Sequence, residues 1–424
     1  MLTLKLIREE KDEVIRRLKI KNFNAEDMVG QIIQKDNNRK ETQTKLDVCL
    51  AESNNISKQV GQLFKEGKKA EAEVLKIKTE SLKNDEKTLK MQLDKIEKEL
   101  DSLVVQLPNL PAEIVPVGKS SENNVIIRSG GQIPTLDKSK VIPHWDLAKK
   151  YDIIDFELGV KITGAGFPVY KGKGSKLQRA LISYFLDKAA ENGYTEVMMP
   201  LMVNEASGFG TGQLPDKEGQ MYHIGIDNFY MIPTAEVPIT NIYRDTILNE
   251  EDFPIKRVGY TPCFRREAGS YGKDVRGLNR LHQFDKVEIV QLRHPADSYH
   301  ALDEMVAYVE SLVASLELPY RILRLCGGDM SFTSAMTYDF EVFSAAQEKW
   351  LEVSSVSNFV DYQANRLKLR FKEKGEKKTQ LAHTLNGSAL ALPRIVAALL
   401  ENNQTENGIR IPKVLVPYTG FEMI

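Results

Sequence analysis

The chain has 424 residues, of which 42% are hydrophobic and 28% are charged, and its 58 basic and 59 acidic side chains give a formal net charge of -1. This length exceeds one ordinary domain and the apolar content excludes a disordered chain, so about two folded units are expected. The near-zero charge argues weakly against a nucleic-acid partner, because phosphate binding usually leaves a basic excess.

The cysteines and the apolar runs indicate where the protein works. Cys49, Cys263 and Cys326 lie far apart and form no C-x-x-C pair, so neither a disulfide framework nor a structural zinc site is expected. The first 20 residues do not resemble a signal peptide, and no apolar run approaches the roughly 18 residues of a membrane helix. We expect a soluble cytoplasmic protein without a membrane partner.

The first 107 residues predict long helices. All 17 prolines lie at or after Pro108, and the stretch before it is rich in charge. Leucine or isoleucine recurs every seven residues from Leu75 to Leu103, which predicts a helix over Lys69–Leu107. Upstream, apolar residues from Ile32 to Leu63 keep a spacing of three and four that polar residues such as Lys35 and Arg39 interrupt, which predicts a second helix of similar length with a less regular apolar seam.

The two helices are expected to form a hairpin. Only Phe64–Lys68 separates them, and Gly67 suits a left-handed helix cap. We predict an antiparallel coiled-coil hairpin, about 55 Å long at 1.5 Å per residue, within an N-terminal domain of residues 1–107. The pattern alone leaves open whether this hairpin is a spacer or dimerisation rod, or an arm that grips a large partner.

Residues 108–424 have a globular composition and predict a second domain. Pro108 ends the helix, and strands and helices then mix without the regular alternation of a parallel sheet, which indicates an α+β fold with an antiparallel sheet. Glycine-rich Ser207–Leu214 is expected to be a loop, and Arg366–Lys372, with alternating basic and apolar residues, a strand. The expected strands are Val197–Val203, Arg257–Tyr260 and Val287–Leu292, and the expected helices are Leu177–Asn192, His300–Leu316 and Ala389–Glu401.

Common catalytic signatures are absent, but one group of charged residues stands in strand-like surroundings. The sequence contains no P-loop, dinucleotide fingerprint, nucleophile elbow or metal-spaced histidines. A two-strand hairpin joined by the basic loop Ala268–Arg280 would bring Arg265, Glu267, Phe284 and Glu288 near one floor. Each alone has an ordinary explanation, since a surface ion pair is worth under about 1 kcal/mol and a phenylalanine is usually core. The occurrence of all four residues in this order along one predicted hairpin favours a functional site.

At this point the sequence resembles the class II aminoacyl-tRNA synthetases, and among them the seryl-tRNA synthetase family. Gly193–Pro200 is similar to motif 1, whose proline marks the dimer interface, Phe264–Glu288 is similar to motif 2, and Thr384–Arg394 is similar to motif 3. The resemblance extends to Thr234–Glu236, Glu352–Ser355 and the N-terminal hairpin, and therefore to essentially the whole chain. It implies a class II catalytic domain with an antiparallel β-sheet flanked by helices, and a homodimer.

The resemblance implies ATP-dependent attachment of L-serine to serine tRNA through a seryl-adenylate, with release of AMP and pyrophosphate. The hairpin would then be the arm that binds serine tRNA, and selenocysteine tRNA stays open as a further substrate. One alternative is a class II ligase that charges a carrier other than tRNA. Another is a coiled-coil interaction protein with a degenerate catalytic domain, against which the intact charged residues argue.

The resemblance also assigns roles to residues. Arg265, Glu267 and Arg394 are the implied catalytic residues: Arg265 bridges the serine carboxylate and the α-phosphate, Glu267 accepts from the adenine amino group, and Arg394 and Arg280 hold the outer phosphates. Phe284 would stack on adenine. Glu352 and Ser355 would be the oxygen ligands of Mg²⁺. Arg266, Val353 and Ser354 complete the implied ATP-binding set, and the implied serine-binding set is Thr234, Ala235, Glu236, Glu288 and Ser388.

Overall fold

The computed structural model describes residues 1–137, 139–267 and 276–424, so Ala268–Val275 of the motif 2 run lie outside the described residues. The chain divides into two compact units: one comprises Met1–Lys19 and Phe23–Pro108, and the other comprises Ile20–Asn22 and Asn109–Ile424. None of the helices in the described ranges is both long and apolar enough to cross a membrane.

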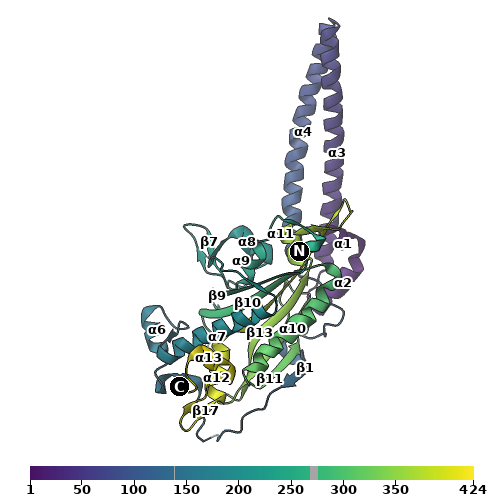
Figure 1. The fold of residues 1–424 in the computed structure, drawn as a ribbon. Coiled ribbons are helices and arrows are strands. Elements are labelled where there is room, and N and C mark those ends of the chain that lie inside the picture. Colours follow the sequence, from purple (N-terminus) through teal and green to yellow (C-terminus); the bar gives the residue numbers. More distant parts are fainter. Residues whose placement is uncertain (138, 268–275) are drawn as a thin grey trace. The chain divides into compact units, whose positions relative to one another are not determined.

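The first unit is helical, and its two long helices lie side by side (Figure 1). Lys35 of one helix contacts Glu99 of the other, and nearer the turn the Lys78 ammonium lies 2.8 Å from the Glu52 carboxylate. The paired residues are closer in sequence nearer the turn, so the two helices run antiparallel. This confirms the predicted hairpin. The second long helix ends at Val104, three residues before the expected end. The helices are α1 (Leu4–Glu9), α2 (Lys11–Ile20), α3 (Glu26–Lys65) and α4 (Lys69–Val104).

A buried carboxylate joins α1 to α3. Asp36 is 2% exposed, and its oxygens lie 2.9 Å from Arg39, 2.9 Å from Lys40 and 3.2 Å from Arg8. Burial raises the pKa of the Asp36 carboxyl, but hydrogen bonds and charges from Lys40 and Arg39 outweigh it, so the pKa lies below its usual value. The carboxylate therefore ties the short first helix to the base of the hairpin.

The second unit is built on an eight-stranded sheet in the order β1-β11-β12-β13-β16-β10-β9-β4. Neighbouring strands pair antiparallel except β4 and β9, which pair parallel. The predicted antiparallel α+β fold is therefore confirmed. The strands are β1 (Val125–Gly130), β4 (Thr195–Glu196), β9 (Ile255–Phe264), β10 (Gln283–Arg293), β11 (Tyr320–Arg324), β12 (Met336–Ser344), β13 (Lys349–Val360) and β16 (His383–Ala391).

Alternation along β10 separates a core face from a polar face. Val287 and Ile289 join the apolar core with residues of α7, α10 and α12, whereas Lys286 and Glu288 point to the opposite face because successive side chains of a strand alternate. Phe284 falls on the same alternation as Lys286 but is only partly buried and also packs against the core. The polar face carries the predicted site residues. The helices that contribute to the core are α5 (His144–Lys150), α7 (Gly172–Glu191), α10 (Ser298–Ser315) and α12 (Leu392–Asn402).

Smaller elements complete the described part of this unit. The helices are α6 (Phe156–Ile162), α8 (Glu205–Thr211), α9 (Glu236–Asn241), α11 (Tyr362–Leu367) and α13 (Val416–Thr419), and the 3₁₀ turns are η1 (Ser121–Asn123), η2 (Glu250–Asp252), η4 (Pro295–Asp297) and η5 (Lys413–Leu415). The short strands are β2 (Ile154–Asp155), β3 (Val169–Tyr170), β5 (Met202–Asn204), β6 (His223–Ile224), β7 (Phe229–Met231), β8 (Ile247–Asn249), β14 (Arg370–Lys372), β15 (Thr379–Leu381), β17 (Gln404–Thr405) and β18 (Gly408–Ile409).

Two expected elements are wrong in their extent. The expected helix Ala389–Glu401 begins only at Leu392, because Ala389–Ala391 end strand β16 and Pro393 occupies the first turn of the helix, where proline is tolerated. Most of the expected strand Val197–Val203 is not a strand: β4 ends at Glu196, before it, and only Met202 and Val203 belong to a strand, β5. In both regions the run of apolar residues continues past the end of one element, so the sequence pattern did not show where that element ends.

Two further expectations failed because local capping and burial decided the backbone. Ser207–Leu214 is mostly helix α8, since the Asn204 side chain caps it by accepting from Ser207 N and Gly212 ends it with φ of 95°. Arg366 belongs to helix α11 and is buried, with its guanidinium donating to the Leu214 carbonyl at 3.0 Å. Only Arg370–Lys372 of the second expected strand is a strand.

Candidate active site

A cluster of buried acidic and polar side chains lies where β10 and β16 pair. Glu288 is opposite Ser388 in the strand register, and the Ser388 hydroxyl donates to Glu288 Oε2 at 3.2 Å. Lys286 Nζ lies 2.6 Å from Glu288 Oε2 and donates to Thr234 Oγ1 at 2.8 Å. All four side chains are buried. Three segments far apart in the sequence therefore contribute polar groups to one small volume.

Glu236, the first residue of α9, adds a second carboxylate to this cluster. Gln363 Nε2 donates to Glu236 Oε1 at 2.7 Å, and Thr384 in turn donates to Gln363 Oε1 at 2.7 Å. Burial and the neighbouring Glu288 charge raise the pKa of Glu236 to about 7, against the opposing effect of Gln363. Two buried carboxylates facing a single lysine leave the cluster short of positive charge, and an added ammonium group would balance it.

An aromatic and cationic surface continues the polar face of β10. The Arg265 guanidinium lies 5.2 Å from the centroid of the Phe284 ring, and both Arg265 and Arg266 are exposed at the end of β9. Arg266 N donates to the Gln220 carbonyl at 2.8 Å, which fixes its backbone. Glu267, with a left-handed φ of 49°, pairs with Arg280. The arrangement presents a flat ring and exposed arginines to solvent.

Helix α12 brings Arg394 to the same region. Arg394 Nη1 donates to the Glu352 carbonyl at 2.8 Å and Nε donates to the Asn279 carbonyl at 2.9 Å, while the Glu352 carboxylate lies 3.9 Å away. Two backbone carbonyls thus hold the guanidinium in place. Its charge is left available, because a half-exposed carboxylate at this distance neutralises it only weakly.

Strand β13, which carries Glu352, pairs with β12 so that two oxygen groups face each other. Ser355 on β13 is opposite Asp339 on β12 in the register. Burial and the Glu352 charge raise the pKa of Asp339 well above its usual value, and a hydrogen bond from Ser355 lowers it. Among the described residues, no set of three or more His, Cys, Asp or Glu side chains is arranged to hold a metal ion. Glu352, Ser355 and Asp339 thus place side-chain oxygens on two paired strands.

Not every implied site residue presents a side chain to this surface. Ala235 is fully buried in a small apolar cluster, and Val353 lies in the main core. Ser354 is buried, and its hydroxyl donates to the Ser388 carbonyl at 2.6 Å. These three positions offer a ligand only backbone groups.

Sequence reasoning missed Lys286 and Gln363, which hold the two carboxylates, and Asp339. Lys286 had a readable signal, because it alternates with Phe284 and Glu288 along one strand and so shares their face. Gln363 had none, since it reaches Glu236 from helix α11, 127 residues away in the chain.

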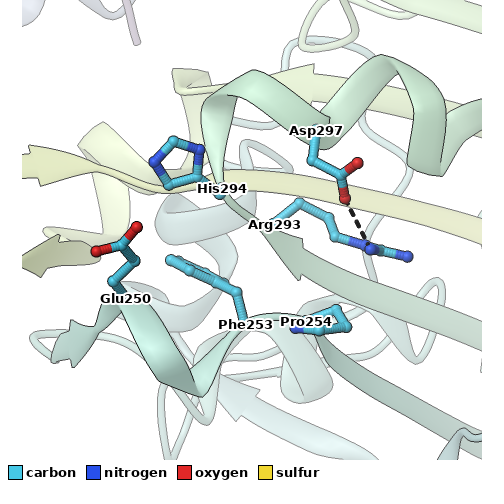
Figure 2. A pocket seen from close by; sticks show the side chains of 6 residues that line it. All are labelled: Glu250, Phe253, Pro254, Arg293, His294 and Asp297. Atoms are coloured by element: carbon cyan, nitrogen blue, oxygen red, sulfur yellow. Dashed lines mark hydrogen bonds and ion pairs between the residues drawn. The ribbon is translucent and has the colours of Figure 1, made fainter. Parts of the chain in front are cut away.

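A separate cavity of about 250 Å³ lies elsewhere in the second unit, lined by Glu250, Phe253, Pro254, Arg293, His294 and Asp297 (Figure 2). None of the implied site residues lines it. The guanidinium that lines it, that of Arg293, is already paired with Asp297 at 2.8 Å, as the dashed line in Figure 2 marks, and with Glu304 at 2.9 Å. A buried guanidinium satisfied on two sides has little left to offer a ligand.

Comparison with known proteins identifies the family. Residues 1–111 match the model of the seryl-tRNA synthetase N-terminal domain, and residues 222–403 match the tRNA synthetase class II core domain (G, H, P, S and T). A serine--tRNA ligase of Salinibacter ruber is 50% identical over 425 residues, which cover 100% of this chain and 99% of the relative. The chain belongs to the seryl-tRNA synthetase family.

Solved structures agree with this assignment. The seryl-tRNA synthetase of Pyrococcus horikoshii, complexed with ATP, has a TM-score of 0.92 and 33% identity and covers 100% of this chain and 99% of its own. The cytoplasmic serine-tRNA ligase of Naegleria fowleri, in complex with AMP, has a TM-score of 0.87 and 27% identity and covers 100% of this chain and 98% of its own. The fold expected from the resemblance is confirmed over the whole chain.

Family membership makes the chain an ATP-dependent ligase that attaches serine to tRNA. The two alternatives from the sequence, a ligase for a carrier other than tRNA and a coiled-coil protein with a degenerate catalytic domain, are not favoured, because serine--tRNA ligases match both units from end to end. The inference from net charge was wrong: a total of -1 averages over the chain and hides where the cations lie.

Proposed function

We propose that serine and ATP bind side by side on the polar face of β10. The observation that carries this proposal is the succession along one strand of Phe284, Lys286 and Glu288, from an aromatic ring beside exposed arginines to a buried acidic pocket. A nucleotide on the ring and an amino acid in the pocket would meet at Arg265. The reacting groups would then be neighbours before any chemistry begins.

In the acidic pocket, Glu236 and Glu288 would bind the ammonium group of serine. Ser388 and Thr234 would pair with its hydroxyl, and the backbone at Ala235 would line the pocket wall. Because these groups lose their partners when the hydroxyl is missing, alanine should be rejected by about 10⁴-fold or more. Threonine must be excluded by lack of room for its extra methyl group.

On the nucleotide side, adenine would stack on Phe284, with its amino group donating to Glu267. Arg265 would contact both the serine carboxylate and the α-phosphate, and Arg266, Arg280 and Arg394 would neutralise the remaining phosphate charge. The other nucleotide contacts would come from the backbone at Val353 and Ser354.

The chemistry then needs no nucleophile from the enzyme. A serine carboxylate oxygen attacks the α-phosphorus, the bond to the bridging oxygen breaks, and pyrophosphate leaves. A ribose hydroxyl of the terminal adenosine of tRNA next attacks the seryl carbonyl carbon, and AMP leaves. Positioning of the two reactants can supply about 7 to 11 kcal/mol of the barrier reduction.

Glu352 and Ser355 fit the family's need for Mg²⁺. Both present hard oxygen donors, and a single carboxylate with a hydroxyl matches an ion that keeps water and substrate phosphates in its coordination shell. Bound Mg²⁺ would offset phosphate charge and orient the leaving pyrophosphate.

The N-terminal domain of residues 1–107 would bind serine tRNA through the α3–α4 hairpin, and residues 108–424 would form the catalytic domain. Support for a homodimer comes from the segment around Pro200, where Met198 is 94% exposed and Leu201 and Met202 are also exposed. Large apolar side chains gathered at a surface are typical of a contact with another chain.

The arginine assignment is tested by Arg265→Ala in serine-dependent pyrophosphate exchange. Loss of a contact made to both reactants should lower kcat/KM by at least about 100-fold. Arg257→Ala on the same strand is the matched control and should exchange at the wild-type rate. Exchange by Arg265→Ala at a near wild-type rate would show that this arginine does not bridge the substrates.

The role of the arm is tested by deleting Ala25–Leu107. Pyrophosphate exchange should survive, which also reports that the catalytic domain is folded, while charging of serine tRNA is lost. If the deleted protein charged serine tRNA as well as the full chain, the hairpin would be a spacer.

A further inference from the structure

His144 is a fully buried histidine that the proposed mechanism does not use. It begins helix α5, and its ring Nδ1 lies 2.7 Å from Oε1 of Glu401, which is also fully buried, near the end of α12. The other ring nitrogen, Nε2, accepts a hydrogen bond from the backbone N–H of Leu278 at 2.9 Å. The ring therefore joins a helix of the core to the segment Arg276–Arg280, which lies within the motif 2 run.

These contacts determine the protonation state of the ring. The Leu278 N–H can only donate, so Nε2 must offer a lone pair, and the single ring proton sits on Nδ1 facing Glu401. Glu401 also accepts from the backbone N–H groups of His144 and Ala346 and from the Ser344 hydroxyl. All of these groups donate, so Glu401 is the common acceptor of the cluster, as a carboxylate is.

The segment approaches His144 too closely for any residue but glycine at position 277. Gly277 has φ of +67°, and a Cβ atom there would overlap His144 Nε2 and crowd the Trp145 ring. Arg276 places its guanidinium 4.6 Å from the centroid of the Trp145 ring. Three successive residues of the segment are thus fitted to the start of α5.

The anchored segment holds two of the proposed phosphate-binding arginines. The Asn279 carbonyl accepts from Arg394 Nε at 2.9 Å, and the Asn279 side chain donates to Gln347 Oε1 at 2.8 Å. Gln347 in turn reaches Glu401 Oε1 at 3.3 Å, so the carboxylate supports Asn279 as well as His144. Arg280, the next residue, pairs with Glu267. A shift of Leu278 would move the Asn279 carbonyl that holds Arg394, and it would move Arg280 itself.

We propose that His144 is a positioning residue for the nucleotide site. As a neutral imidazole held by Glu401, it anchors the Leu278 N–H and so sets the places of Arg280 and, through Asn279, of Arg394. This inference rests on the proposed function, which assigns these arginines to ATP. It separates His144 from the serine pocket, whose carboxylates are held by Lys286 and Gln363 instead.

Two amide variants of His144 test the anchor. In His144→Gln, the longer side chain can place its carbonyl oxygen where Nε2 accepts from Leu278. In His144→Asn, the shorter side chain can donate to Glu401 but cannot reach Leu278. We expect His144→Asn to raise the KM for ATP by about tenfold and to lower the kcat of pyrophosphate exchange by about 10- to 100-fold, with the KM for serine unchanged. His144→Gln should recover most of this loss.

A second pair of variants approaches the same contact from the segment. Gly277→Ala places a methyl group against His144 Nε2 and should reproduce the ATP-specific loss. Gly375→Ala is the matched control, because Gly375 also has positive φ, +86°, but open space around its Cβ position, so it carries the backbone strain without the collision. It should leave both KM values unchanged. Thermal unfolding of all four variants shows which are folded at the assay temperature.

The outcomes separate the anchor from a purely structural role and from the proposed function. Equal loss in His144→Asn and His144→Gln, or equal increases in the KM values for ATP and serine, would overturn the anchor, as would wild-type kinetics in a folded Gly277→Ala. Arg394→Ala serves as the reference for the proposed function. If it leaves the KM for ATP unchanged, the assignment of the arginine is wrong; if it raises this KM while His144→Asn does not, only the anchor is wrong.

Discussion

Serine binding should depend on pH through Glu236. Burial and the Glu288 charge raise the pKa of this carboxyl to about 7, so near neutral pH about half of the free enzyme carries a proton on it. An ammonium ligand favours the carboxylate, so binding releases the proton. About one tenth of the group is ionised one pH unit below the pKa and about nine tenths one unit above it, so the KM for serine should fall about tenfold from pH 6 to pH 8.

Pyrophosphate exchange at saturating ATP, with serine varied at each pH, measures this effect. Glu236→Gln cannot titrate and should give a weaker but pH-independent KM for serine, and the KM for ATP should show no matching trend in either protein. A flat serine profile in the wild type, or the same slope in Glu236→Gln, would refute the assignment.

The same group affects stability with a definite sign. In the unfolded chain its pKa is about 4.5, so the unliganded protein holds a proton that the unfolded chain has lost between about pH 4.5 and pH 7. The contribution of Glu236 to stability is fully present below pH 4.5 and is lost as the pH rises through about 7. Urea unfolding at several pH values in this window measures the effect. The free energy of unfolding should fall with rising pH more steeply in the wild type than in Glu236→Gln, by the amount that one titrating group contributes.

Three further predictions concern the parts that support the site. Asp36→Asn removes the charge that pairs with Arg8, Arg39 and Lys40, and should destabilise the helical unit by about 2 to 3 kcal/mol in urea unfolding followed by circular dichroism, with pyrophosphate exchange unchanged; an unchanged midpoint would contradict it. Phe340→Ala empties a fully buried position of β12 and should cost about 3 to 5 kcal/mol in unfolding of the catalytic unit, whereas a smaller loss would mean that the core collapses around the cavity. Glu352→Gln should raise the Mg²⁺ concentration for half-maximal exchange by about tenfold without changing the KM for serine, and an unchanged Mg²⁺ requirement would remove Glu352 from the cation site.

Local sequence patterns were enough for much of the architecture. The seven-residue repeat from Leu75 to Leu103 and the absence of proline before Pro108 predicted the hairpin, because helix periodicity is a property of neighbouring residues. The predicted ends of helices and strands were wrong where local sequence signals conflicted. Ala389–Ala391 read as the start of a helix but end strand β16, where Ala391 pairs with Lys286 of β10, since ladder partners far away in the chain outweighed helix propensity.

The candidate site shows the same division. The order of charged and aromatic residues from Arg265 to Glu288 indicated the family, the fold and the residues to examine. Only the tertiary structure brought Lys286 to Thr234, Gln363 to Glu236 and His144 to Leu278. By itself the sequence determined which residues alternate on a strand and which repeat along a helix. Tertiary structure decided which side chains from distant segments share a buried volume, because pKa values and hydrogen-bond partners depend on neighbours in space.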